Sequence, residues 1–347
     1  MEIPDYYRQA HRLAFAPLLF QAARVALDRG LLEALEGSGG LGLSPEEAAA
    51  ACGLSLYATR VLLEGCTAAG AVEVQEGQER YRLGPVGRLL LHDELVRVNL
   101  DFSHDVCYQG AFFLDEALAQ GRPAGLKVFG SWDTIYQGLM DLPAQARKSW
   151  LAFDHKYSDT VFPPLLASVF DRPVRSLLDV GGNTGKWAML CLEAQTDLRV
   201  TLLDHASQAQ TAAANAVLSG VSERLSTHPL DLLDHSQAFP RAFEVVWMSQ
   251  FLDCFGEADM VQLLRRGREA LAPGGRLMVL EPCWDSQPND VARDAVMATS
   301  LYFACMANGK SRMFHSQDLL RGFAAAGLKL AASEQQGFHT LFTCVAA

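Results

Sequence analysis

The chain has 347 residues, of which 50% are hydrophobic and 20% are charged, so it is long enough for about two domains with buried cores. Acidic residues outnumber basic ones, 40 to 29, and the formal charge of -11 disfavours nucleic acid as a partner. The longest uncharged run near the N-terminus, residues 13–23, is far shorter than the ~20 apolar residues that cross a bilayer, so we expect no membrane span.

Eight cysteines are scattered along the chain without a CxxC pair or zinc-finger spacing. This pattern predicts reduced thiols in a cytoplasmic protein without a structural metal. The run at 13–23 follows Arg8 and Arg12 but has no clear small-residue cleavage site, which favours an amphipathic helix over a signal peptide.

Residues 44–83 contain a series of helix and hairpin signals. Ser44 and Glu47 flank a proline in the pattern of a capping box, and Ser55 can cap a second helix that ends at Gly70. The apolar positions expected on one face of that second helix are Leu56, Val61, Leu62 and Cys66. Alternating runs at 72–74 and 80–83 around a turn at 75–79 predict a hairpin, which completes a winged helix.

The predicted winged helix is acidic, with four arginines against six glutamates between residues 41 and 91. A DNA reader carries a basic face, so we expect this module to serve dimerisation or structure instead. Residues 92–170 are predicted to be mainly helical, with a break at 121–123 and many aromatic residues, most of them in the core.

After Pro173, short strands alternate with helical stretches, which is typical of a parallel sheet covered by helices. We expect strands at 176–180, 199–204, within 224–231, 244–249 and 276–281, with further strands at 328–333 and 338–345. A helix at 260–271 is expected to pass into the fifth strand through a turn at 273–275. The expected fold is therefore α/β, a Rossmann-like doubly wound sheet with an N-terminal, mainly helical winged-helix domain.

The sharpest motif is the run LLDVGGNTG at 177–185, an apolar strand that enters a glycine-rich turn. It is not a Walker loop, because Lys186 is followed by Trp187 rather than by Ser or Thr. Asp204 ends the next strand about 20 residues later, where a carboxylate can accept both hydroxyls of a ribose, so a nucleoside-containing cofactor is implied. Asp231 follows the third strand and has two interpretations, a contact to adenine or a turn residue.

Several runs, taken in chain order, resemble the class I S-adenosylmethionine-dependent methyltransferases of the caffeate and hydroxyindole O-methyltransferase type. They are LLDVGGNTG, TLLDH, PLDLLD, EVVWMSQFLDCF, LAPGGRLMVLEP and NGKSRMFHSQDLLRGFAAAGL. The resemblance covers nearly the whole chain. It implies a winged-helix dimerisation domain at 1–100, a helical linker or substrate cap at 101–170 and a cofactor-binding catalytic domain at 171–347, in a homodimer to which a helix at 13–35 contributes.

The resemblance implies S-adenosylmethionine as cofactor, S-adenosylhomocysteine as its product, and no metal. Glycines would contact the amino-acid moiety, Asp204 would bind the ribose, and Asp231 with Leu232 would contact the adenine. Carried over residue by residue, the cofactor contacts are Gly181, Gly182, Gly185, Asp204, His205, Asp231, Leu232, Ser249 and Tyr157. Asn183 replaces a central glycine, which is compatible with binding because Asn tolerates left-handed backbone.

The catalytic positions depart most from the resembled family. Where that family has a His-Asp pair, this chain has Asp253 and Cys254; one supporting glutamate is kept as Glu281, and the second is Ser311. Asp253 is the candidate base and Glu281 its partner. The residues expected to border the acceptor are Phe153, Phe251, Tyr302, Phe303 and Met306.

Three interpretations of this departure remain open. In the first, Asp253 acts as the base. In the second, little base is needed, because the acceptor is already anionic or because a ring carbon ortho to a phenolate takes the methyl group, which gives C-methylation. In the third, the chemistry has changed or been lost. A histidine could also replace the lost base, the candidates being His104, His155, His315 and His339. We expect O-methylation of a phenolic hydroxyl on a small aromatic or polyene-type secondary metabolite, with C-methylation second and a ligand-binding or winged-helix regulator as a distant alternative.

Overall fold

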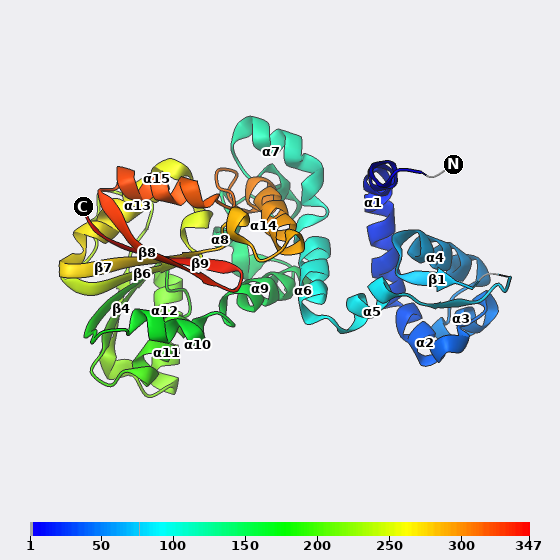
Figure 1. Ribbon diagram of the computed structural model, residues 1–347, viewed down its shortest axis with the longest axis horizontal. Coiled ribbons are helices and arrows are strands. Elements are labelled where there is room, and N and C mark those ends of the chain that lie inside the picture. Colours follow the sequence, from blue (N-terminus) through cyan, green and yellow to red (C-terminus); the bar gives the residue numbers. More distant parts are fainter. Residues whose placement is uncertain (1–2, 76) are drawn as a thin grey trace. The chain divides into compact units, whose positions relative to one another are not determined.

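The computed structural model describes residues 3–75 and 77–347. The chain divides into two compact units, the first ending at Ser103 and the second running from His104 to Ala347 (Figure 1). None of the helices in the described part of the chain has the length and apolar content needed to cross a membrane.

The first unit is mainly helical and carries a small hairpin. Its elements are α1 (Asp5–Asp28), α2 (Leu31–Gly37), α3 (Pro45–Cys52), α4 (Leu56–Ala69), β1 (Val72–Val74), β2 (Tyr81–Leu83), α5 (Pro85–His92) and α6 (Glu94–Phe102). One apolar core joins α1, α2, α3, α4 and the hairpin, and includes Leu31, Leu35, Leu63 and Leu83.

The predicted start of α3 and the predicted start and end of α4 are confirmed. The backbone N–H of Glu47 donates to Ser44 Oγ at 3.2 Å, and the Ser44 N–H donates back to Glu47 Oε2 at 2.8 Å, a complete capping box. Ser55 caps α4 and Gly70 ends it in the left-handed conformation, with φ 81°.

Two sequence predictions for these helices are wrong. Cys66 is buried and Leu62 half-buried on α4 as predicted, but Leu56 and Val61 are exposed. The buried side of α4 carries Thr59, Leu63 and Cys66, because the helix packs on α1 through a face rotated from the predicted one. The single helix expected at 13–35 is two helices, since the chain turns at Gly30 with φ 72° between α1 and α2.

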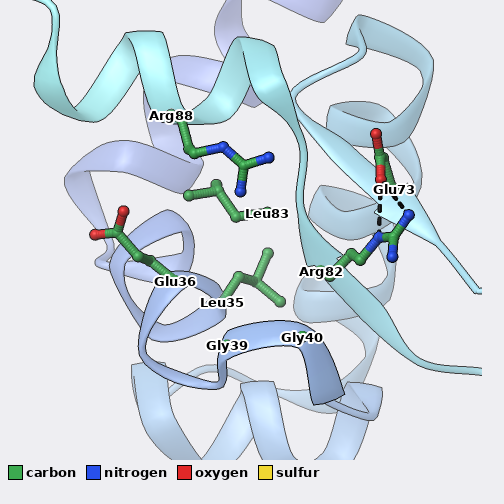
Figure 2. Close-up of a pocket in the computed structure, with 8 residues that line it drawn as sticks. All are labelled: Leu35, Glu36, Gly39, Gly40, Glu73, Arg82, Leu83 and Arg88. Atoms are coloured by element: carbon green, nitrogen blue, oxygen red, sulfur yellow. Dashed lines mark hydrogen bonds and ion pairs between the residues drawn. The ribbon is translucent and has the colours of Figure 1, made fainter.

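The hairpin pairs Val72 with Leu83 as predicted, although residue 76 of the expected turn at 75–79 lies outside the described residues. A pocket of about 430 Å³ beside the hairpin has side chains of both charges, with Arg82 bonded to Glu73 at 2.8 Å (Figure 2). Arg60 and Arg80 are likewise paired with glutamates. Pairing therefore neutralises much of the positive charge that a DNA reader would present.

The second unit contains a helical lead-in followed by an α/β sheet. Its elements are α7 (Leu114–Gln120), α8 (Ile135–Gly138), α9 (Ala144–Ser158), α10 (Phe162–Val169), β3 (Ser176–Val180), α11 (Lys186–Ala194), β4 (Arg199–Asp204), α12 (Ala206–Leu218), β5 (Leu225–Pro229), β6 (Phe243–Ser249), α13 (Glu257–Glu269), β7 (Leu271–Glu281), α14 (Asp290–Tyr302), α15 (Ser316–Ala325), β8 (Leu328–Gln336) and β9 (His339–Ala346).

The sheet has seven strands in the order β5-β4-β3-β6-β7-β9-β8. Five are parallel, but β9 runs antiparallel to β7 and β8 antiparallel to β9, so the sheet is mixed, with its antiparallel strands at one edge. The two-residue link 337–338 allows only a hairpin, since a parallel crossover needs a dozen residues or more.

Both faces of the sheet are covered, as expected for a doubly wound fold. Along β6, Val245 and Trp247 join the core under α10, α11 and α12, whereas Val246 and Met248 join the core under α13 and α15 (Figure 1). The carboxyl ends of β3, β4, β6 and β7 therefore lie along one edge, where ligands bind in such folds.

The segment at 273–275 is a bulge inside β7 rather than a turn. The pairing with β6 shifts between Phe243 and Val245, and Gly274 has φ 74°. The helix before it, α13, also begins and ends earlier than the predicted 260–271.

Candidate active site

The glycine-rich turn after β3 has no room for side chains. At Gly181, with φ +72°, a Cβ would lie 2.3 Å from the Phe251 ring, and at Gly182 one would lie 2.7 Å from Asp179 Oδ2. Asn183 follows with φ 49°, which confirms that asparagine adopts the left-handed backbone here. Glycine is therefore required at 181 and 182 by close packing against Phe251 and Asp179.

Asp204 anchors this turn to the end of β4. Its Oδ2 accepts the Asn183 N–H at 2.8 Å and its Oδ1 accepts the His205 N–H at 2.7 Å. The side chain is buried, and burial raises the pKa of Asp204 while these two hydrogen bonds hold it down. Each oxygen keeps a second lone pair, so the carboxylate can still accept ribose hydroxyls. His205 itself is exposed and contributes its backbone N–H.

The residues expected to contact the adenine and the methyl end of the cofactor differ in burial and in hydrogen bonding. Asp231 lies two residues beyond β5, is exposed and accepts the Leu233 N–H at 3.0 Å, so it serves as a turn residue in this structure. Leu232 is buried, with its carbonyl bonded to Arg266 at 2.7 Å. Ser249 Oγ is buried and has no hydrogen-bond partner within the described part of the chain.

Asp179 is a buried acid that sequence reasoning did not select. It lies beneath Gly182, and burial together with the Asp204 charge raises the pKa of Asp179 to about 8. Its Oδ2 has no partner among the residues that the structure describes. The sequence signal that could have identified Asp179 is an acidic residue within the otherwise apolar run LLDV.

Glu281, the last residue of β7, holds the turn that follows β6. Its Oε1 accepts the N–H groups of Phe251 at 2.9 Å and Leu252 at 2.7 Å, and the side chain is fully buried. Burial first and the Asp253 charge second raise the pKa of Glu281 well above its usual range. Gln250 at the start of this turn has φ 48°, a left-handed backbone unusual for a side-chain-bearing residue and frequent at functional sites.

Asp253 lies in that turn, within the short helix Leu252–Cys254, and only 5% of it is exposed. Burial is the main reason that the pKa of Asp253 is raised to about 7, near the range of a histidine. The Cys254 thiol donates to Asp253 Oδ1 at 3.5 Å, and the Tyr136 hydroxyl donates to Cys254 Sγ at 3.2 Å. The structure therefore brings Asp253 and Glu281 together, as expected, and adds Tyr136.

The aromatic residues expected around the acceptor fall into separate groups. Phe251 packs against Gly181, and the rings of Phe153 and Tyr157 lie 4.9 Å apart on α9. Tyr302 accepts the Trp150 indole N–H at 2.7 Å and its ring is 5.3 Å from that of Phe303. Met306 is buried against two glycines, where an added Cβ on Gly110 would lie 2.0 Å from its sulfur, so it fills the core.

The four candidate histidines have other partners or are neutral. His104 Nδ1 lies 2.7 Å from Asp105, His155 Nδ1 lies 3.0 Å from Lys186, and His315 Nδ1 accepts the Gln317 N–H at 3.1 Å. His339 is buried, which lowers its pKa to about 4 and keeps the ring neutral.

Family models match both halves of the chain. Residues 7–81 match the Dimerisation2-like domain and residues 113–327 match the O-methyltransferase domain. The chain belongs to this O-methyltransferase family, and it is an S-adenosylmethionine-dependent methyltransferase. Among the described residues, no group of His, Cys, Asp and Glu side chains is arranged to hold a metal ion.

Individual relatives show which chemistries this family includes. The chain is 28% identical to L-tyrosine C(3)-methyltransferase of Streptomyces lavendulae over 85% of this chain and 79% of the relative. It is 30% identical to Aclacinomycin 10-hydroxylase RdmB of Streptomyces purpurascens over 81% of this chain and 74% of the relative. The crystal structure of the S-adenosylmethionine-dependent methyltransferase SibL matches with a TM-score of 0.71 and 27% identity, covering 96% of this chain and 98% of that one.

We expect Gly181→Ala to impair cofactor binding, because the new Cβ would need a left-handed backbone and would collide with the Phe251 ring. Calorimetric titration with S-adenosylhomocysteine should show at least about a tenfold weaker affinity, equivalent to the loss of about 1.4 kcal/mol. Gly220→Ala is the matched control, since Gly220 also has positive φ but its Cβ would meet nothing within 4 Å. Equal affinity in both variants would contradict the expected role of the turn.

Proposed function

We propose that this enzyme transfers a methyl group to the phenolic oxygen of a small aromatic or polyene-type acceptor, with Asp253 as the general base. The observation that carries the proposal is a buried carboxyl group at the usual base position, with its pKa raised to about 7. Such a group is partly ionised at neutral pH and can take a phenolic proton. The O-methyltransferase family match supports oxygen as the first choice of acceptor atom.

In this proposal, different residues of the chain bind the cofactor, fix the base and accept the proton. Gly181, Gly182 and Gly185 would bed the amino-acid end of S-adenosylmethionine, and Asp204 would accept its ribose hydroxyls. When bound, the cofactor supplies an electrophilic methyl group. Glu281 holds the turn through two N–H groups and so fixes Asp253, which accepts the proton from the acceptor.

The remaining assignments extend the same proposal. His205, Asp231, Leu232, Ser249 and Tyr157 would complete the cofactor site. Phe153, Phe251, Tyr302 and Phe303 would border the acceptor, with Met306 behind them, and residues 101–170 would form a helical cap. The eight free thiols support a reducing compartment such as the cytoplasm.

Methylation of a ring carbon next to a phenol is the second candidate. The tyrosine C(3)-methyltransferase relative supports it, and an ortho carbon activated by a phenolate can accept the methyl group with little help from a base. To decide between the two, we would incubate the enzyme with 13C-methyl-labelled S-adenosylmethionine and a panel of L-tyrosine, caffeate and a hydroxyindole. A labelled methyl ether in the NMR spectrum supports the first choice, and a labelled aryl methyl group supports the second. A product that has gained an oxygen atom, as the hydroxylase relative suggests, would overturn both.

We expect Asp253→Asn to lower kcat by about 100-fold or more, because an amide cannot accept the acceptor proton. In the wild-type enzyme kcat/KM should rise with pH and level off above about 7, where Asp253 is ionised. The variant should lose this rise yet keep its affinity for S-adenosylhomocysteine. Unchanged turnover, measured with the acceptor found above, would remove Asp253 from the base role.

Asp253→Asn should also stabilise the folded protein at alkaline pH. The folded carboxyl binds its proton more tightly than the unfolded one, so its contribution to stability is lost as pH rises from about 4 to about 7. The Tm of the variant relative to wild type should therefore be higher at pH 8 than at pH 5. Asp294→Asn, which changes an exposed carboxylate on α14, should show no such trend.

We also propose that the enzyme is a homodimer through its N-terminal domain. Leu13 and Leu18 of α1 are 77% and 68% exposed, and the Dimerisation2-like match covers this helix. Sedimentation should show a dimer for the wild type and a monomer for Leu13→Glu with Leu18→Glu. Leu218→Glu is the matched control, an 85% exposed leucine of α12. A monomeric wild type would refute the dimer.

A further inference from the structure

The Cys254 thiol lies between the candidate base and a tyrosine hydroxyl. Cys254 Sγ accepts the Tyr136 hydroxyl at 3.2 Å and donates to Asp253 Oδ1 at 3.5 Å. Both hydrogen bonds run in the same direction, so the hydroxyl polarises the thiol and strengthens its donation to the carboxyl group. These three side chains form a hydrogen-bond relay that joins α8 to the turn after β6, across 118 residues of the chain.

The backbone of Cys254 is held as well as its thiol. Asn308 is buried, and its Nδ2 donates to the Cys254 carbonyl at 3.0 Å and to Ser311 Oγ at 2.8 Å. Asn308 Oδ1 in turn accepts the N–H groups of Lys310 at 2.8 Å and Ser311 at 2.9 Å. The amide of Asn308 is therefore fixed, and it ties Cys254 to the segment that follows α14.

Both donors of the relay keep their protons at neutral pH. Burial, with the Asp253 charge second, raises the pKa of the Cys254 thiol well above its usual range. Burial also raises the pKa of the Tyr136 hydroxyl, and Cys254 adds to that effect. A thiol is a weak donor in general, but a hydrogen bond to a carboxylate in a buried site is stronger than one between neutral groups.

The donation from Cys254 opposes the other influences on the candidate base. Burial and the charge of a second carboxyl group favour the protonated form of Asp253, whereas the hydrogen bond from Cys254 lowers its pKa more than either backbone hydrogen bond does. The other titratable groups around the relay come from three elements. They are Glu281 at the end of β7, Asp154 on α9 and, next to Tyr136, Tyr302 on α14.

The residue type at position 254 fits this role. Where the resembled family has a His-Asp pair, this chain has Asp253 and Cys254. An aspartate at 254 would place a second carboxylate next to the base and favour its protonated form. A thiol adds no charge while it is protonated, and it supplies a donor. The two replacements are therefore matched, because an aspartate base is joined by a neutral donor.

We propose that Cys254, polarised by Tyr136, is the donor that holds the Asp253 carboxylate in its ionised, proton-accepting form. The inference rests on the proposed function, because that function assigns Asp253 as the base. Cys254 and Tyr136 are then positioning residues, since both act on the reaction through Asp253. When Asp253 takes the acceptor's proton, its hydrogen bond from the thiol weakens because the acceptor oxygen has lost its charge.

Infrared spectroscopy of the S–H stretch tests the relay without any methyl acceptor. The Cys254 band is obtained as the difference between the wild type and Cys254→Ser, which lacks this thiol. Because a carboxylate is a better acceptor than a carboxylic acid, the band should move to lower frequency as the pH rises, with a midpoint at about 7. The movement should vanish in Asp253→Asn and become smaller in Tyr136→Phe. A band that does not respond to pH, or that still responds in Asp253→Asn, would overturn the proposal.

The pH dependence of kcat/KM tests the effect of the relay on the base. Cys254→Ala should raise the pH midpoint by roughly 0.5 to 1 pH unit, because the ionised carboxylate loses a donor. Cys254→Ser keeps a donor, so its midpoint should return to the wild-type value or fall below it. Tyr136→Phe should shift the midpoint upward by less, and it should have no further effect when combined with Cys254→Ala.

The matched control is Cys52→Ala, which removes another half-buried thiol, at the end of α3 in the first unit, and should keep the wild-type midpoint. An unshifted midpoint in Cys254→Ala, or a shift that serine does not reverse, would overturn the proposal and leave Asp253 as the base. Unchanged turnover in Asp253→Asn would instead contradict the proposed function, whereas a titrating S–H band would still support the relay. If Cys254→Ala does not fold, the S–H band and the midpoint of Tyr136→Phe decide.

Discussion

The carboxyl group of Glu281 accepts the N–H groups of Phe251 and Leu252, and the candidate active site depends on these two hydrogen bonds. They tie the turn after β6 to the end of β7. The same turn places the Phe251 ring against Gly181 and buries Asp253. The Glu281 side chain therefore links the glycine-rich turn to the candidate base, and its two hydrogen bonds offset part of the cost of burying an acid here.

Sequence reasoning succeeded where the signal was local. The run at 177–185 predicted a strand, a tight turn and a helix because glycine and asparagine are needed at left-handed positions, and Gly181, Asn183 and Gly185 have positive φ. Ser44 and Ser55 predicted helix starts because an N-cap hydrogen bond joins residues only three positions apart, so its signal is also local. The position of Asp204 could be predicted because it is the last residue of β4, whose end lies beside the glycine-rich turn.

The features that could not be predicted depend on long-range packing. Tyr136 reaches Cys254 over a separation of 118 residues, and Trp150 on α9 reaches Tyr302 over a separation of 152 residues. The buried side of α4 and the antiparallel β8–β9 edge likewise follow from neighbours that periodicity does not specify. Asp231 had two interpretations from its position, and its hydrogen bond to the Leu233 N–H is that of a turn residue, while its contact to adenine stays a prediction.

The replacement of histidine by aspartate need not remove base catalysis, because burial can raise the pKa of an aspartate into the range of a histidine. An exposed aspartate near pKa 3.9 is too weak a base for a phenol, whereas burial raises the pKa of Asp253 to about 7, close to the 6.5 of an ordinary histidine. The two bases differ in charge, however. A histidine becomes cationic when it takes a proton and an aspartate becomes neutral, yet a neighbouring sulfonium lowers the pKa of both side chains. A positive charge disfavours protonated histidine and favours ionised aspartate.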